Sequence, residues 1–290
     1  MHQKRGWAVV ALVVLSAGVL GAAVARAEPP EVQKNGIAWA KGHDASHGPA
    51  SKALLSYHGG GVMNTGAAVQ AIFWGTSWPS YSGDKISGID VFYGGISGSA
   101  YLGTTTEYTD GSGNHVSTSV SYGGHLIDGA SAGSKDPGTG GVLAEVSKMI
   151  TNPVANGYYA VYTDIPRGNA GYCAWHSWGT AHGVAVQFGF FFKLDGDAGC
   201  DPGDTSGLHS QGLAAIANVS GHELSEAVTD PHLNAWYDRQ GAENADKCAW
   251  TFNGLEQFSN GTSWKIQGNF SNAAYNARLG YDHAGCVNGN

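Results

Sequence analysis

The chain has 290 residues, a formal net charge of −8 and only 13% charged residues. Phosphate binding needs clustered Lys and Arg, so this composition argues against nucleic acid as a partner. The 45 glycines and 11% aromatic residues instead indicate many turns around a packed core, which is typical of a globular domain and not of a disordered chain.

The first 27 residues are typical of an export signal. Lys4 and Arg5 give a basic start, residues 7–24 are nearly all apolar, and residues 25–27 (Ala-Arg-Ala) match a cleavage site. An uncleaved membrane anchor is the alternative, because the apolar run is long for a signal. We expect a mature chain that begins near Glu28, has no membrane partner after cleavage and is secreted to the extracellular space, with the periplasm as the alternative destination.

Residues 28–52 are polar and mixed in composition, which predicts an extended leader. After this leader, the apolar run at residues 70–74 predicts a strand, and a short helix is expected around residues 86–92. Residues 100–130 are rich in Thr, Tyr, Ser, Val and Gly, which predicts hairpins. The best strand among them is residues 116–122, closed by two glycines.

Helical periodicity appears in the second half of the chain. Apolar residues at three- and four-residue spacings predict a helix over residues 142–151, and aromatic-rich runs predict strands at residues 158–163 and 184–193. Leu213–Thr229 is the clearest helix, because an apolar stripe runs along it and Pro231 stops it. The order helix, strand, strand, helix is the one that zincin-type peptidases use.

No linker or repeat divides the exported part, so we expect one domain over residues 53–290. Its expected fold class is α/β (α+β): a single zincin-like domain with a mixed sheet, a motif-bearing helix and many loops. The even number of cysteines in an oxidising compartment favours two disulfides. Of the three pairings we expect Cys173–Cys200 and Cys248–Cys286, since each closes the loop between its members; a cysteine-rich metal site lacks the usual C-x-x-C spacing.

The last predicted helix carries the sequence His222-Glu223-Leu224-Ser225-Glu226. His222 and Glu226 are four residues apart, roughly 6 Å along a helix, so both side chains can ligate one cation. Glu223 has the position of the general base in the His-Glu-x-x-His motif of zinc peptidases. Because a carboxylate replaces the second His, the pair predicts Zn²⁺, with Ca²⁺ as the alternative. On the ordinary interpretation, Glu223 and Glu226 are solvated helix residues and His222 is a half-buried histidine whose hydrogen bonds are satisfied.

A zinc site needs a third ligand. Asp230 lies roughly 12 Å along the helix from His222, which is too far for a shared ion. His232 has the spacing of the third ligand in metzincins, although Thr229 stands where those proteins have Gly. The candidates, in order of preference, are Asp238 and His232 together, then His176, with Glu243 and Asp246 as later candidates.

If zinc is bound, it lowers the pKa of a bound water and polarises the scissile carbonyl. Glu223 then takes the proton of the water and passes it to the leaving amine, and Tyr237 or a nearby His stabilises the oxyanion. The expected function is a secreted zinc peptidase with protein or peptide substrates. The alternatives are a non-enzymatic protein that binds cell-wall glycan or a protein partner through exposed aromatic side chains, and a structural metal site.

Two further motifs have simple explanations. Residues 57–61 (Tyr-His-Gly-Gly-Gly) lack the Lys and Ser/Thr of a P-loop, so tight-turn packing is expected. Asp195 and Asp197 lack the remaining ligand positions of an EF-hand, so a solvated loop is expected.

Several segments together resemble the EXORDIUM (phosphate-induced protein) family, in its bacterial and fungal branch. The matching segments are Tyr57–Gly60, Ala71–Gly75, Tyr172–His176, Gly221–Pro231, Ala235–Asp238 and Glu243–Cys248. The resemblance spans most of the exported chain and implies an extracellular protein. Plant members of this family look like growth-related apoplastic proteins without a settled enzymatic role, and they lack the His-Glu-x-x-Glu residues. The resemblance therefore implies that His222, Glu223 and Glu226 are an addition of this branch, and that Asp230-Pro231 is a structural helix stop.

Overall fold

The computed structural model describes residues 2, 34–43 and 53–289. The chain divides after Glu31, and the second unit, Val32–Asn290, contains all the elements described below. Apart from residue 2, the expected export signal lies outside the described residues. Residues 28–33 and 44–52 of the expected leader lie outside them as well. Within the described part, no helix is long and apolar enough to span a bilayer.

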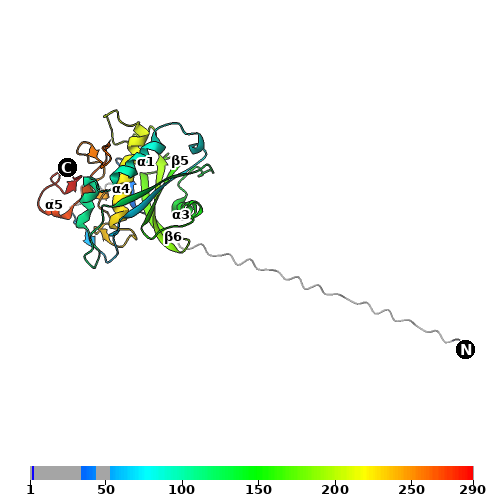
Figure 1. The fold of residues 1–290 in the computed structure, drawn as a ribbon, viewed down its shortest axis with the longest axis horizontal. Coiled ribbons are helices and arrows are strands. Elements are labelled where there is room, and N and C mark those ends of the chain that lie inside the picture. The colour runs from blue at the N-terminus through cyan, green and yellow to red at the C-terminus, as the bar shows by residue number, and fades with distance from the viewer. Residues whose placement is uncertain (1, 3–33, 44–52, 290) are drawn as a thin grey trace. The chain divides into compact units, whose positions relative to one another are not determined.

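A six-stranded mixed sheet forms the centre of the second unit (Figure 1), in the order β1-β6-β7-β5-β3-β4. The strands are β1 (Asn35–Trp39), β3 (Ala67–Trp74), β4 (Val120–Asp128), β5 (Gly157–Pro166), β6 (Tyr172–Ala181) and β7 (Val184–Lys193). The β1–β6 and β6–β7 pairs are antiparallel, and the β7–β5, β5–β3 and β3–β4 pairs are parallel. The expected α/β (α+β) class with a mixed sheet is confirmed.

Helices cover both faces of this sheet. Figure 1 shows α1 (Lys85–Ile96) and α4 (Gln211–Thr229) on one side and α3 (Gly138–Met149) on the other. Because side chains alternate between the two faces of a strand, the sheet contacts helices on both sides. The Tyr162 hydroxyl on β5 hydrogen-bonds to Ser220 of α4, and Gly179 on β6 lies beside Leu143 of α3. The most deeply placed helix is α4, because every residue from Gly212 to Thr229 is buried.

Short elements and two disulfides complete the unit. The short elements are β2 (Ser56–Tyr57), η1 (Trp78–Ser80), α2 (Ala100–Gly103), η2 (Thr104–Glu107), β8 (Trp236–Tyr237), η3 (Asp246–Cys248), β9 (Glu256–Gln257), β10 (Ser263–Trp264), β11 (Asn269–Phe270), α5 (Asn272–Asn276) and β12 (Cys286–Val287). The disulfides are Cys173–Cys200 and Cys248–Cys286, which confirms the expected pairing.

Of the hairpins expected over residues 100–130, the structure has one short antiparallel turn, closed by an isolated bridge between Thr109 and His115. That stretch contains α2, η2 and then β4, which pairs in parallel with β3 and includes Gly123 and Gly124 within the strand. Local hydrogen bonds favour the helical turns, since the hydroxyls of Thr104, Thr105 and Thr106 each bond to the carbonyl three residues earlier.

The expected leader contributes a strand to the sheet. Asn35–Trp39 forms β1, which pairs with β6 at the edge of the sheet. β6 itself was not predicted as a strand. These two neighbouring strands bring the leader and His176 to the same place in the fold.

Candidate metal centre

The helix α4 places the three motif residues in the protein interior. It begins at a cap in which Ser210 Oγ accepts a hydrogen bond from Leu213 N at 3.2 Å, and it ends before Pro231. His222 is 1% exposed and both Glu223 and Glu226 are 0% exposed. This burial excludes the interpretation of the two carboxylates as solvated surface groups.

His222, Glu226 and Asp246 form a first group of ligand atoms. His222 Nε2 lies 3.2 Å from Glu226 Oε1 and 3.6 Å from Asp246 Oδ1. Asp246 belongs to η3, and its backbone N donates a hydrogen bond to Glu226 Oε1 at 2.9 Å. Two ligands on a tetrahedral Zn²⁺ at ordinary bond lengths are about 3.4 Å apart, so the two distances from His222 Nε2 match the spacing that a zinc ion requires.

His176, Glu226 and Glu243 form a second group. His176 Nε2 lies 3.2 Å from Glu243 Oε2 and 3.6 Å from Glu226 Oε2. In both groups, the ligand atoms lie within 4.8 Å of one another. Glu226 therefore belongs to both groups, with Oε1 facing His222 and Oε2 facing His176.

Several atoms of the centre are buried without a hydrogen-bond partner among the described residues: His222 Nε2, Asp246 Oδ1, Glu226 Oε2 and Glu223 Oε2. Buried polar atoms are nearly always paired, because an unpaired polar group in a protein interior costs free energy, and a buried charge costs more. A divalent cation between His222, Glu226 and Asp246 would supply the missing partner for two of these atoms, His222 Nε2 and Asp246 Oδ1.

Gln267 holds the His222 ring in place. Its Nε2 lies 2.9 Å from His222 Nδ1 and 2.8 Å from the carbonyl oxygen of Ala245. This contact directs Nε2 of the imidazole toward Glu226. In this orientation of the amide, Gln267 donates to Nδ1; ligation of a metal through Nε2 requires the opposite orientation, in which the amide oxygen accepts from Nδ1–H.

The pKa values of the centre follow from its burial and its density of charge. Burial raises the pKa of Glu223 well above the ordinary carboxyl range; the charge on His222 opposes this rise, and Glu226 adds to it. Burial lowers the pKa of His222, but the neighbouring Glu226 and Asp246 outweigh that effect and raise it well above 6.5. Burial lowers the pKa of His176 to about 4, so this imidazole is neutral and able to ligate a metal at neutral pH.

Strand β1 lies directly over the centre. A Cβ atom on Gly36 would overlap both the imidazole of His176 and the Glu226 carboxylate. Two residues further along, Ala38 N donates a hydrogen bond to Glu223 Oε1 at 3.3 Å. The candidate base and both ligand groups are thus covered by the chain itself.

Three residues predicted for the site lie outside both ligand groups. Asp238 Oδ1 accepts hydrogen bonds from the backbone N atoms of residues 240 and 242, and its Oδ2 lies 3.2 Å from Lys247 Nζ. His232 packs against Trp178 with ring centroids 4.9 Å apart, and Tyr237 stacks on His58 at 3.6 Å. Of the candidates for the third ligand, the structure brings His176, Glu243 and Asp246 to Glu226.

The remaining predictions concern polar turns. Asp230 Oδ1 accepts hydrogen bonds from the backbone N atoms of residues 234 and 235, as a structural helix stop requires. Tyr57 OH donates to Gly60 O at 2.6 Å, which is the expected tight-turn packing. The loop after β7 is held by ion pairs and is not simply solvated, because Asp195 pairs with Lys85 and Asp197 with Arg167.

Two residues beside the centre carried no recognisable signal in the sequence. Gln267 follows a short strand far from the motif. The Tyr158 hydroxyl on β5 is buried and without a hydrogen-bond partner among the described residues, and its pKa is raised by burial and then by the charges of Tyr93, Glu223 and Glu226. Only the fold brings these polar groups to the motif helix.

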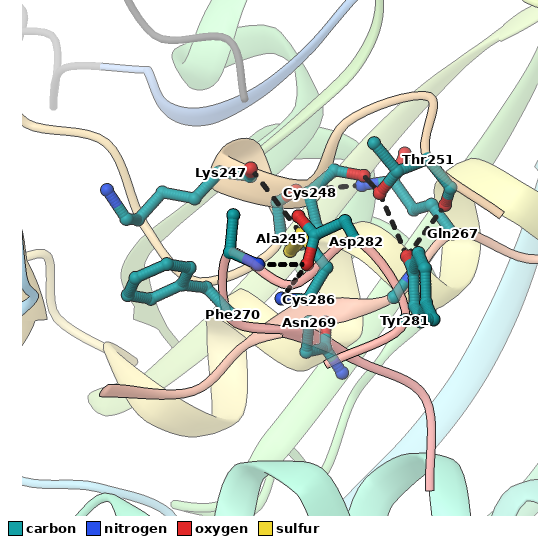
Figure 2. The surroundings of a disulfide bond; sticks show 12 residues. Ala245, Lys247, Cys248, Thr251, Gln267, Asn269, Phe270, Tyr281, Asp282 and Cys286 are labelled. Carbon is teal, nitrogen blue, oxygen red and sulfur yellow. Dashed lines mark hydrogen bonds between the residues drawn. A yellow bond between two sulfur atoms is a disulfide. The ribbon is translucent and has the colours of Figure 1, made fainter. Parts of the chain in front are cut away.

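The disulfide Cys248–Cys286 supports the segment that carries Asp246. Cys248 is the last residue of η3, and Cys286 begins β12, so the bond joins this turn to the C-terminal strand. Figure 2 shows Ala245, Lys247 and Gln267 around this bond. Asp246, the disulfide Cys248–Cys286 and Gln267 therefore lie in one packed region.

Comparison with known proteins gives no match: no family model, no curated protein and no solved structure matches this chain. The function is therefore inferred from the residues of the site and their geometry.

Proposed function

We propose that this chain is a secreted metal-dependent peptidase in which His222, Glu226 and Asp246 hold a zinc ion and Glu223 is the general base. One observation carries the proposal: Nε2 of His222 and Oδ1 of Asp246 are buried, lack hydrogen-bond partners among the described residues, and converge with Glu226 at the spacing of metal ligands. Without a metal, a protonated His222 has to pair with Glu226 and Asp246 in the protein interior, and such buried charges are costly to desolvate. With a cation each of these atoms has a partner.

The protein groups divide the chemistry between them. Zinc bound at this group supplies a Lewis acid for the scissile carbonyl and a water of lowered pKa. Glu223 is the residue that moves the proton: its carboxyl is buried beside the ligands, and Oε2 has no competing hydrogen bond among the described residues. Gln267 orients the His222 ring, so it is a positioning residue.

The location and the family are part of the same proposal. Two disulfides are typical of proteins in oxidising compartments, which supports export from the cytosol. Membership of the bacterial and fungal EXORDIUM branch rests on the resemblance of the segments around His176 and His222. Glycan binding by exposed aromatic rings has less support, because every Trp, Tyr and Phe among the described residues is buried or half-buried.

Metal analysis of the purified chain is the first test. We expect about one zinc per chain in the wild type and almost none in His222→Ala, because the variant loses a ligand. His232→Ala is the matched control, since His232 lies outside both groups, and it should keep its zinc. A wild-type chain that binds no divalent metal after incubation with zinc would overturn the proposal.

Activity is the second test. Glu223→Gln should keep its zinc and lose at least about 100-fold in the hydrolysis of an unfolded protein such as casein, since general-base catalysis contributes 10²–10⁴-fold. Removing the metal with a chelator should abolish hydrolysis by the wild type. In a form of the chain that hydrolyses casein, equal activity with and without Glu223→Gln, or with and without metal, would contradict the assigned roles.

A further inference from the structure

The outer strand of the sheet is supplied by the N-terminal segment. β1 pairs antiparallel with β6, with Ala38 opposite Ala174 and Trp39 opposite Tyr172. Without β1, the edge of β6 would present unpaired N–H and C=O groups next to His176. Such an edge is a template for an added extended strand.

The same strand closes the metal centre. Gly36 lies against His176 and Glu226. Ala38 N donates a hydrogen bond to Oε1 of Glu223. His176, Glu223 and Glu226 are 0% exposed as a result of the surrounding packing, to which β1 contributes. A substrate therefore has no access to the base or to either ligand group while β1 is in place.

The backbone of β1 departs from regular extended geometry at the point where it crosses the ligands. The register shifts between Asn35 and Ile37, and Gly36 has a φ of +47°, in the left-handed region. A bulge with a left-handed Gly bends a strand locally. β1 therefore bends at Gly36, where it crosses the ligand groups, and its backbone is not regularly extended at that residue.

Contacts at both ends hold β1 on the edge. Lys34 Nζ lies 2.5 Å from Asp136 Oδ2 and 5.2 Å from the ring centre of Trp175. At the other end, the Trp39 carbonyl accepts a hydrogen bond from Trp250 Nε1 at 2.8 Å. Between these contacts, the Ala38 side chain is 3% exposed, so this position accepts a small apolar residue.

We propose that the edge of β6 is the binding site for an extended polypeptide substrate, and that β1 is an intramolecular occupant that keeps the centre latent until it leaves. The inference rests on the proposed peptidase function for its biological meaning. The ligand class follows from the occupant: an extended backbone that pairs with β6, carries a small side chain at the Ala38 position and directs an N–H to Glu223.

Substitution of Gly36 tests this inference in the full-length chain. In Gly36→Val the side chain is strained by the positive φ and overlaps His176 and Glu226, so the strand is forced off the edge. Gly42→Val is the matched control. Gly42 also has a positive φ, of +79°, but its Cβ meets nothing within 4 Å.

The first readout is the reactivity of the zinc-free proteins with diethylpyrocarbonate, mapped by mass spectrometry. We expect His176, the imidazole that Gly36 covers, to react at least about tenfold faster in Gly36→Val than in wild type or Gly42→Val. A synthetic peptide covering residues 34–41 should then protect the His176 ring again. With zinc present, Gly36→Val should hydrolyse casein at least about tenfold faster than wild type, and the peptide should inhibit it.

A second variant covers the case in which Gly36→Val does not fold. Lys34→Ala removes the anchor to Asp136 from a partly exposed position, and it should increase the reactivity of His176 about two- to fivefold while keeping a cooperative thermal transition. Unchanged reactivity in the folded variants, or no protection by the peptide, would overturn the inference. If reactivity and peptide protection change as expected but no form hydrolyses casein, the binding site stands and the peptidase proposal fails.

Discussion

Glu226 is the residue on which both ligand groups depend. Its two carboxylate oxygens face different histidines, Oε1 toward His222 at 3.2 Å and Oε2 toward His176 at 3.6 Å. Burial raises the pKa of Glu226, Asp246 adds to this rise, and the charge on His222 opposes it. A carboxyl in such surroundings is ionised at low cost only beside a cation, so we expect metal binding and ionisation of Glu226 to be coupled.

Substitution of this carboxylate should therefore remove the metal. Glu226→Gln keeps an oxygen that can accept the hydrogen bond from Asp246 N but loses the negative charge, so we expect zinc affinity to fall by more than about tenfold. Titration with zinc in competition with a chelator measures the change. Glu145→Gln is a suitable control, because Glu145 is 4% exposed but belongs to neither group; an equal loss in both variants would contradict the assignment.

Gln267 tests the support of the imidazole. Gln267→Leu removes the polar group beside His222 Nδ1 and should lower zinc affinity about 10- to 100-fold, the usual effect of losing a hydrogen-bond partner of a metal-ligating His. The solvent-exposed Gln257 offers the matched substitution, and Gln257→Leu should leave affinity unchanged. Unaltered affinity in Gln267→Leu would show that Nδ1 needs no partner there.

Glu256 gives a pH dependence away from the centre. Burial raises the pKa of its carboxyl from 4.5 to about 7, with the hydrogen bond from Asn288 opposing the rise. The folded state therefore holds this proton to higher pH than the unfolded state, and stability is lost as pH rises between about 4.5 and 7. Glu256→Gln cannot titrate, so its stability relative to wild type should increase across this interval, by up to about 3 kcal/mol. Urea unfolding at pH 4.5 and pH 7.5 measures the difference, and a constant difference would refute the shift.

Whether a helix or strand could be predicted from the sequence depended on whether the interactions that form it are local. α4 was predictable because its apolar stripe and the Pro231 stop are encoded within the helix itself. β1 was not, since the polar composition of residues 28–52 hides a strand that is stabilised by pairing with distant β6. Regular hairpins over residues 100–130 were wrong for the same reason, because β4 pairs in parallel with β3 across α1, α2 and two 3-10 turns.

The cap of α4 is a test at this scale. Ser210 Oγ accepts from Leu213 N and donates to Asp84 Oδ1, so it joins the start of the helix to the residue before α1. Ser210→Ala should lower the free energy of unfolding by about 1 kcal/mol, a typical cost of losing an N-cap. Thermal or urea unfolding measures it. Ser210→Asp, which keeps a capping oxygen but lies beside the Asp84 carboxylate, should recover only part of the loss.

For the molecule as a whole, the site could be predicted only in part. The His222–Glu226 pair and Glu223 follow from spacing on one helix. The partners His176, Glu243 and Asp246 come from β6 and from the loop before Cys248, and their convergence depends on the packing of distant segments. Preference for Asp238 followed from its nearness to the Pro231 turn, but that carboxylate is taken by backbone N–H groups and Lys247.

The two disulfides separate global stability from the geometry of the centre. In the chain-entropy model, loops of 38 and 27 residues predict similar losses of about 4 kcal/mol when either bond is removed. Only Cys248–Cys286 anchors the η3 turn that carries Asp246 (Figure 2). We therefore expect paired Cys→Ala substitution at 248 and 286 to lower zinc affinity by about tenfold or more beyond any effect of the same substitution at 173 and 200.

Chelator competition at a temperature where both double variants remain folded measures this contrast, and urea unfolding checks that their stability losses are comparable. The reason is local: once the bond is cut, η3 is tied to β12 only by non-covalent contacts, so Asp246 is no longer held at the distance from His222 that a shared ion requires. Equal affinities in the two variants would mean that the backbone hydrogen bond from Asp246 N to Glu226 suffices to hold the ligand, and that the disulfide contributes to stability alone.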